Sequence, residues 1–364
     1  MGKMSVNLIA IAMSCWAGAA SAQFNPAEEA VLLATNPAQG DLFGYTVAIS
    51  GEVAVVGSAQ GDKAHVFRRV GGAWAEDQKL TGGAQDSFGG AVDIDADIIV
   101  VGDIDWISST LVGPGAAHVF RWDGASWVQE TTLVASDGVV GDRFGDVVAV
   151  NGDTILVGAT ERRAGYIYWH DGMNWVEQGK LTGGAGQFGE YVALSDDTAV
   201  VSGRSSATLV FERAGTTWSQ SAVLNPTLLP GGGLEAVAIA GDTLAISSTK
   251  EFWIYSRLGT DWPEQLHETE PVPGSNSWFG SSLALSGDES ILLVGAHGEN
   301  VNGQSAGAVH VYRSFDGTWQ GLEILSAASP STGDNFGFSV GFSGDTALVG
   351  AWGEDPLGIG AAGT

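Results

Sequence analysis

The chain has little with which to form cross-links or bind polyanions. It contains one cysteine, Cys15, and only 15 Lys or Arg residues against 42 Asp or Glu, which gives a net charge of −27. Phosphate neutralisation needs clustered basic residues, so nucleic-acid partners are not expected, and the negative charge also disfavours docking on anionic lipid. Solubility outside the cell is the simplest interpretation of this acidity. Divalent-cation binding is a second, which requires specific carboxylate geometry.

Familiar catalytic motifs are also missing. The sequence has no G-x-S-x-G, no H-E-x-x-H and no Gly-rich phosphate loop. No catalytic residue is therefore predicted, although enzyme sites assembled from several loops leave no local motif.

Glycine and apolar residues are abundant. The chain has 54 glycines and 13 tryptophans, and 44 % of its residues are hydrophobic whereas 16 % are charged. Many glycines among aromatic and β-branched residues predict short strands joined by tight turns around a large core.

The first 22 residues have the pattern of a secretory signal peptide. Lys3 supplies the positive charge, Leu8 to Ala20 the apolar segment, and Ala20-Ser21-Ala22 a cleavage site before Gln23. We therefore predict a secreted or cell-surface protein, extracellular or periplasmic. Processing would remove Cys15 and leave no disulfide and no segment able to span a membrane.

The remainder is built from seven repeats. Six are marked by a Phe-Gly pair, at Phe43-Gly44, Phe88-Gly89, Phe144-Gly145, Phe188-Gly189, Phe279-Gly280 and Phe336-Gly337, and a degenerate copy stands at Leu234-Glu235. Their period of roughly 40 to 50 residues indicates a β-propeller or another stacked array.

Each repeat predicts four antiparallel strands, A to D. Strand A follows the Phe-Gly pair, and a short turn of glycine and acidic residues leads to strand B. Strand B is a continuous apolar run, as expected for burial on both faces. Strand C carries aromatics, and strand D starts at a tryptophan and alternates like an outer strand.

The last repeat stops before its strand C. The segment from Glu28 to Ala34 resembles a lone strand D, which would close the ring by joining this repeat. The expectation is one seven-bladed β-propeller domain over residues 23–364, with its last blade incomplete, closed by the N-terminal strand and truncated in this sequence. The expected repeats are 41–85, 86–141, 142–185, 186–231, 232–276, 277–333, and 334–364 with 23–40.

With these features the chain resembles bacterial FG-GAP repeat proteins, whose repeats are related to the propeller of integrin α-subunits. The resemblance rests on the Phe-Gly pairs and on Val-Gly-Ala steps such as Val157-Gly158-Ala159, and it covers Gln23 to Thr364. It implies an extracellular, usually non-enzymatic propeller used in adhesion or ligand binding.

Calcium sites are not carried over from that resemblance. The integrin calcium loops lie in the A–B hairpins, which here have shrunk to turns such as Ser50-Gly51-Glu52 and cannot wrap six to eight oxygens. The nearest remnant is Asp93, Asp95 and Asp97, a weak metal candidate that also fits an ordinary hairpin. No cofactor is expected.

Residues that recur at one position are interpreted as structural. His65, His118 and His310 share one strand C position on separate repeats, which favours packing over a metal triad. The acids two residues before Phe, such as Asp142 and Asp334, are predicted to cap nearby backbone amides.

Function is instead expected in the unequal loops between strands B and C. These loops are longest in repeats two, six and seven, with 16, 15 and at least 13 residues, against 6 to 8 in the others. In a closed ring the long loops would crowd one sector. They carry the candidate ligand-binding residues Asp103, Asp105, Trp106, His297, Glu299, Asn300, Trp352, Glu354 and Asp355.

Tryptophans beside carboxylates and amides suit an extracellular carbohydrate or protein ligand, because aromatic faces give contact area at low entropy cost. The same loops also fit tolerated insertions that pack back on the blades. The leading hypothesis is a non-enzymatic binding or adhesion propeller. The alternatives are a hydrolase or lyase acting on an extracellular polymer, and a structural surface element.

Overall fold

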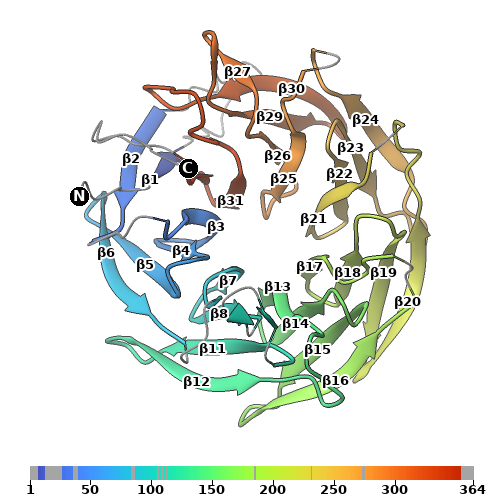
Figure 1. The fold of residues 1–364 in the computed structure, drawn as a ribbon. Coiled ribbons are helices and arrows are strands. Elements are labelled where there is room, and N and C mark those ends of the chain that lie inside the picture. The colour runs from blue at the N-terminus through green and yellow to red at the C-terminus, as the bar shows by residue number, and fades with distance from the viewer. Residues whose placement is uncertain are drawn as a thin grey trace.

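The structure is a computed structural model in which four-stranded sheets radiate around a central channel (Figure 1). It describes residues 7–12, 27–35, 40–82, 87–104, 106–107, 110–111, 113–183, 186–230, 232–272 and 275–353. Every element in these ranges is a strand. None of the described residues forms a helix long and apolar enough to cross a membrane.

Six blades are each made from consecutive strands, with the innermost strand given first. Blade 1 is β3 (Phe43–Ser50), β4 (Val53–Ser58), β5 (Lys63–Val70) and β6 (Ala73–Leu80). Blade 2 is β7 (Val92–Asp95), β8 (Ile98–Asp103), β11 (Ala116–Trp122) and β12 (Trp127–Leu133). Blade 3 is β13 (Phe144–Asn151), β14 (Thr154–Ala159), β15 (Ala164–His170) and β16 (Trp175–Leu181).

The chain continues around the ring in the same way. Blade 4 is β17 (Tyr191–Ser195), β18 (Thr198–Ser202), β19 (Thr208–Ala214) and β20 (Thr217–Leu224). Blade 5 is β21 (Leu234–Ala240), β22 (Thr243–Ser248), β23 (Glu251–Ser256) and β24 (Glu264–Thr269). Blade 6 is β25 (Phe279–Leu285), β26 (Ile291–Ala296), β29 (Ala308–Phe315) and β30 (Thr318–Leu325).

Two small hairpins extend the B–C loops of blades 2 and 6. They are β9 (Trp106–Ile107) with β10 (Thr110–Leu111), and β27 (Asn300–Val301) with β28 (Gln304–Ser305).

The last repeat does not make a blade of its own. It contributes β31 (Ser339–Ser343) and β32 (Thr346–Ala351), and the chain start adds β1 (Asn7–Ala12) and β2 (Ala27–Leu33). We call this four-stranded sheet, in the order β31-β32-β1-β2, the composite sheet. Counted as blades made from a single repeat, the structure contains six and not the predicted seven.

The predicted N-terminal strand does lie at the outer edge of the composite sheet, as β2. The strand next to it was not foreseen, because β1 lies inside the predicted signal peptide. Asn7 to Ala12 pair antiparallel with Ala351 to Thr346 on one side and with β2 on the other. β1 therefore pairs with the edge of β32 at the place where the other blades pair their third strand.

Apolar packing between neighbouring sheets forms the core. All six residues of β4, β8, β14, β22, β26 and β32 are buried, as the continuous apolar runs predicted. Each core cluster joins two neighbouring sheets: one contains Val55 of blade 1 with Ile99 and Trp127 of blade 2. The strand D tryptophans Trp127, Trp262 and Trp319 are buried in such clusters.

The recurring glycine of strand B allows the blades to approach closely. A Cβ on Gly102 would lie 2.0 Å from the carbonyl oxygen of Gly145, the Phe-Gly glycine of the next blade. The composite sheet makes the same contact with blade 1, through Gly350 and the carbonyl of Gly44. Ser339 Oγ also donates to this carbonyl at 3.0 Å, so the two ends of the chain meet in a closed ring.

Candidate ligand-binding site

The Phe-Gly pair, or its Leu-Glu equivalent, forms a bulge at the start of the inner strands of blades 1, 3, 5 and 6. In β3, Phe43 pairs with Ser58 but Thr46 pairs with Gly57, so Gly44 and Tyr45 are left out of register. Gly44 has φ 87°, in the left-handed region that glycine adopts without steric cost. Bulges redirect the side chain beside them. The residue after the glycine therefore faces the channel instead of the neighbouring blade.

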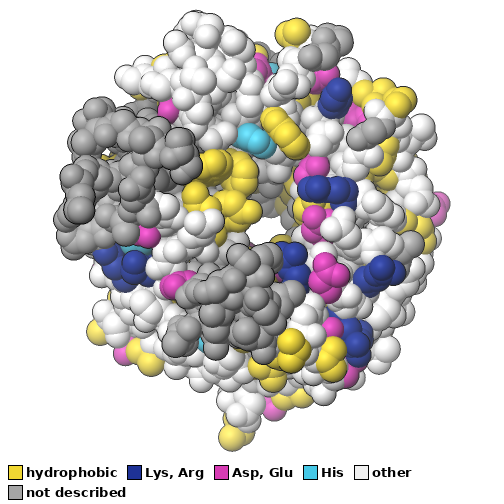
Figure 2. Space-filling model, in the orientation of Figure 1, with side chains coloured by type: hydrophobic (Ala, Val, Ile, Leu, Met, Phe, Trp, Pro, Cys, Tyr) yellow, Lys and Arg dark blue, Asp and Glu magenta, His cyan; other side chains and the backbone are white. Residues whose placement is uncertain are grey.

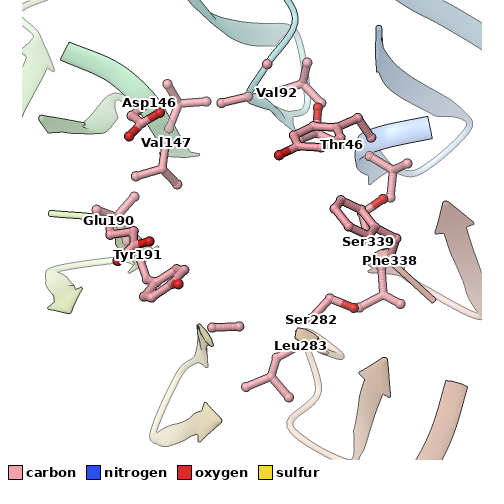
Figure 3. Close-up of a pocket in the computed structure, with 18 of the residues that line it drawn as sticks. Thr46, Val92, Asp146, Val147, Glu190, Tyr191, Ser282, Leu283, Phe338 and Ser339 are labelled. Atoms are coloured by element: carbon pink, nitrogen blue, oxygen red, sulfur yellow. The ribbon is translucent and has the colours of Figure 1, made fainter. Parts of the chain in front are cut away.

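These redirected residues line a cavity of about 320 Å³ at one end of the channel. Figure 3 shows side chains from all parts of the ring around this cavity. We call this end of the molecule the FG face. One lining position follows the Phe-Gly pair, or its Leu-Glu equivalent, in every repeat: Tyr45, Gly90, Asp146, Glu190, Ala236, Ser281 and Phe338.

Charged groups occupy the part of the rim contributed by blades 3 to 5. Arg143 Nη2 donates to Asp146 Oδ1 at 2.9 Å, and Thr160 Oγ1 donates to Asp146 Oδ2 at 2.6 Å. Arg204 Nη2 lies 3.1 Å from Glu235 Oε2 and 3.9 Å from Glu190 Oε1. Each of these three acids thus has an arginine beside it, and two of them share Arg204. Burial raises the pKa of Glu235, and the Arg204 charge opposes that rise.

Aromatic rings occupy the part contributed by blade 6, the composite sheet and blade 1. The rings of Tyr45 and Phe338 are 5.0 Å apart, and Phe338 lies 5.1 Å from the His297 ring and 5.9 Å from Trp352. The His297 ring stacks on Trp278 at 5.5 Å. Burial lowers the pKa of His297 to about 4, so the imidazole is neutral at pH 7. Figure 2 shows hydrophobic side chains and a histidine gathered on one side of the central opening.

Two of the predicted ligand-binding acids instead contact strand C histidines. Asp103 is buried, and its Oδ2 lies 3.6 Å from His118 Nε2. His310 Nε2 donates to Glu299 Oε2 at 2.6 Å. Each acid thus pairs within its own blade.

The strand C histidines themselves pack as predicted. His65, His118 and His310 are buried, and each meets the Phe of its own Phe-Gly pair edge to face, at 5.0, 5.3 and 5.0 Å. The described residues contain no group of three or more His, Cys, Asp or Glu that could hold a metal ion.

The other predicted binding residues fall into three groups. His297 and Trp352 belong to the aromatic part of the FG face. Asn300 Oδ1 accepts from Gly303 N at 2.8 Å and so shapes the β27–β28 turn. Trp106 is placed only as part of β9, and Asp105, Glu354 and Asp355 lie outside the described residues.

The weak metal candidate lies at the opposite end of the channel, which we call the hairpin face. Asp93 accepts from Ile94 N at 2.9 Å and Val150 N at 2.7 Å, and Asp95 accepts from Gly152 N at 2.7 Å. Asp97 Oδ2 lies 3.2 Å from Arg121 Nη1. Each of the three carboxylates thus already accepts from a backbone N–H group or faces an arginine of the protein. Burial raises the pKa of Asp93 to about 7 against these amide bonds, and Asp95 adds to the rise.

Asp95 belongs to a ring of hydrogen bonds between neighbouring hairpins. A side-chain oxygen at the end of strand A accepts a backbone N–H from the next hairpin in five cases, at 2.7 to 3.1 Å: Ser50, Asp95, Asn151, Ser195 and Ser343. Ala240 has no side-chain oxygen to accept a hydrogen bond. At this position Glu289 Oε2 of blade 6 instead accepts from Asp242 N at 3.1 Å. In the five cases the polar side chain at the end of strand A therefore links its hairpin to the hairpin of the next blade.

The prediction that acids before the Phe-Gly pairs cap backbone amides is confirmed for Asp142 and Asp334. Asp142 Oδ2 accepts from Val139 N at 2.8 Å, and Asp334 Oδ2 accepts from Ser331 N at 2.6 Å.

Sequence reasoning missed the residues after the Phe-Gly pairs. Tyr45, Asp146, Glu190 and Phe338 differ from one another, yet they directly follow the most constant positions of the repeat. A variable residue directly after a constant Phe-Gly pair was the sequence pattern that could have identified these cavity-lining positions.

Comparisons with known proteins agree with this architecture. A family model described as FG-GAP repeat matches residues 26–71, 127–168, 262–312 and 319–363. No curated protein sequence matches the chain.

Solved structures share the fold at low sequence identity. A chain in the crystal structure of a mitotic checkpoint complex aligns with TM-score 0.57 and 10 % identity, covering 85 % of this chain and 90 % of that one. A functionally unknown protein from Desulfotomaculum acetoxidans DSM 771 aligns with TM-score 0.57 and 12 % identity, covering 89 % and 97 %. From its repeats, its blades and the family match over half its length, the chain belongs to the FG-GAP repeat family.

Proposed function

We propose that this protein is a secreted or cell-surface, non-enzymatic binding propeller whose ligand docks on the FG face. One observation carries the proposal. The side chains that differ most between repeats, such as Tyr45, Asp146 and Phe338, line a single cavity, whereas the constant positions hold the blades together. Variable side chains gathered around one cavity on a constant repeat scaffold have the form of a binding face.

We further propose that the composite sheet serves as the seventh blade. Its support is the closure contact, in which Ser339 and Gly350 meet the Gly44 carbonyl as corresponding residues do between other blades. Without this sheet, the aromatic part of the rim would lose Phe338 and Trp352.

The expected location and partners follow from composition. A signal-like N-terminus supports export, and a net charge of −27 argues against nucleic acid and anionic membranes. The partner would be an extracellular protein or carbohydrate, with no cofactor and no membrane insertion after signal cleavage. Cleavage before Gln23 would also remove β1 from the composite sheet.

Binding is favoured over hydrolysis by the pairing of the acids near the FG face. Glycoside hydrolysis needs two carboxylates facing one substrate, one of them as a proton donor. Here Asp146 pairs with Arg143, Glu235 with Arg204, and Glu299 with His310.

The test compares two bulky substitutions at opposite ends of the channel. Ala236→Trp would fill the FG-face cavity, whereas Asp153→Trp would add the same side chain to an exposed turn on the hairpin face. The full chain and both variants are applied to printed arrays of oligosaccharides and of overlapping peptides. We expect hits that Ala236→Trp abolishes and Asp153→Trp keeps.

Three results would contradict the proposal. The absence of any hit, or equal loss in both variants, would leave a structural surface element as the better account. Shortening of a bound oligosaccharide during incubation, followed by mass spectrometry, would favour the hydrolase or lyase.

A further inference from the structure

A continuous set of aromatic rings leads from the rim of the FG face to the central cavity. The Trp278 and His297 rings are 5.5 Å apart, those of His297 and Phe338 5.1 Å, and those of Phe338 and Tyr45 5.0 Å. We call these four residues the aromatic track. They come from three adjacent units: blade 6 supplies the first two, the composite sheet Phe338, and blade 1 Tyr45.

Trp278 forms the outer end of the track, and 47 % of the residue is exposed. Its backbone is left-handed, with φ 54°, as it is at the same position before three other Phe-Gly pairs, where Leu42, Arg143 and Asn335 have φ 51°, 57° and 58°. This conformation therefore belongs to the repeat. What distinguishes Trp278 is a large indole left exposed at the rim, where it can offer a contact face to a ligand.

The surroundings of Trp278 offer four hydrogen-bonding residues, of which three are neutral and one, Lys250, is positively charged. The hollow beside the indole is lined by Thr249, Lys250, Ser275 and Asn276. At the inner end, the cavity wall adds the hydroxyls of Ser282 and Ser339. Hydroxyl and amide groups beside aromatic faces match a sugar, which has apolar C–H faces and a rim of hydroxyls.

Charge at the cavity disfavours an anionic ligand. Three acids stand at the rim: Asp146 pairs with Arg143, whereas Glu190 and Glu235 share Arg204, so the rim keeps a net negative charge. His297 is neutral at pH 7, because burial lowers its pKa to about 4. The net charge of −27 repels polyanions such as uronic acid chains.

We propose that the aromatic track binds a neutral oligosaccharide chain, with one sugar on Trp278 and others leading to the central cavity. The track spans three structural units, so a chain of sugars fits it better than a single ring. This proposal rests on the proposed function of the FG face and names its ligand class.

The experiment uses the full chain and isothermal titration with neutral hexasaccharides of glucose, mannose, xylose and N-acetylglucosamine, and with hexagalacturonate as the charged probe. Trp278→Gly removes the ring while suiting the left-handed backbone, so the melting temperature should stay equal or rise. We expect at least one neutral hexasaccharide to bind and its affinity to fall tenfold or more in this variant. Phe338→Ala should also weaken it.

Phe315→Ala is the matched control. Phe315 is also an exposed aromatic of blade 6, at 42 %, but it ends β29 at the opposite end of the blade. This variant should bind as the unchanged chain does.

Different outcomes separate this inference from the proposed function. Peptide binding that Trp278→Gly abolishes would overturn the sugar ligand and leave the FG face as a binding face. Tighter binding of hexagalacturonate than of every neutral probe would also overturn it. Neutral sugar binding that neither Trp278→Gly nor Ala236→Trp weakens would overturn both proposals.

Discussion

The two ends of the central channel are made by the same seven repeats but differ in kind. At the hairpin face, Ser50, Asp95, Asn151 and Ser195 do one job, accepting a backbone N–H from the next blade. At the FG face, the equivalent residues range from Gly90 to Phe338 and line a cavity. A repeat protein can vary one end freely because the other end, with the buried strands, holds the ring.

The largest expected effect comes from opening the ring that both ends share. Signal-peptide cleavage before Gln23 would remove β1 and expose the edge of β32. We expect a chain starting at Gln23 to lose on the order of 3–6 kcal/mol of unfolding free energy, since several strand hydrogen bonds to two neighbours are lost. Guanidinium unfolding of both chains measures this. Equal midpoints and slopes would mean that β1 is dispensable to the fold.

The constant glycine at the FG face should be nearly as sensitive. Gly102→Ala places a methyl group 2.0 Å from the Gly145 carbonyl oxygen, in rigid backbone. We expect a loss of about 2–4 kcal/mol. Gly179→Ala, in β16 with nothing within 4 Å, is the matched control and should be neutral or slightly stabilising. Similar behaviour of the two variants would remove the close-approach explanation.

A smaller effect is expected from pH at the hairpin face. The pKa of Asp93 is raised to about 7, so between its ordinary value and 7 the folded chain holds a proton that the unfolded chain has released. Its contribution to stability is therefore full at acid pH and declines as the pH rises to 7. Asp93→Asn should reduce the change in unfolding free energy between pH 5 and 7.5 by about 1–2 kcal/mol. An unaltered pH profile would show that Asp93 titrates normally.

The smallest effect concerns one link of the hydrogen-bond ring. Ser195→Ala removes the acceptor for Gly241 N and should cost about 1 kcal/mol. Ser219→Ala, an exposed serine of the same blade, is the control. Loss of ligand binding in Ser195→Ala at unchanged stability would break the division between the two faces.

The constant positions made much of the fold predictable. The Phe-Gly motif, as at Phe43-Gly44, recurs because the bulge requires it, and the Val-Gly-Ala motif, as at Val157-Gly158-Ala159, recurs because neighbouring blades approach closely there. These recurring motifs let the sequence alone indicate four-stranded blades. The strand C position of β1 was not predictable, because Leu8 and its neighbours also fit a signal peptide. Strand pairing between chain ends depends on tertiary contacts that local pattern does not encode.

The site was harder to predict than the fold. Loop length pointed to Asp103 and Glu299, but each pairs with a buried histidine of its own blade, which sequence position does not reveal. His297 and Trp352 did fall beside the cavity. Trp278 and Tyr45 were passed over because they adjoin Phe-Gly pairs that were interpreted as structural.

The most direct test of the division between the faces is a hydrogen–deuterium exchange footprint of the full chain with and without its bound hexasaccharide. Slower exchange is predicted for the segments that follow the Phe-Gly pairs in blades 1 and 6 and in the composite sheet, 44–47, 280–283 and 337–340. The hairpin turns at 95–97, 151–153 and 195–197 should exchange at unchanged rates. Protection confined to those turns, with none at the FG face, would contradict the account.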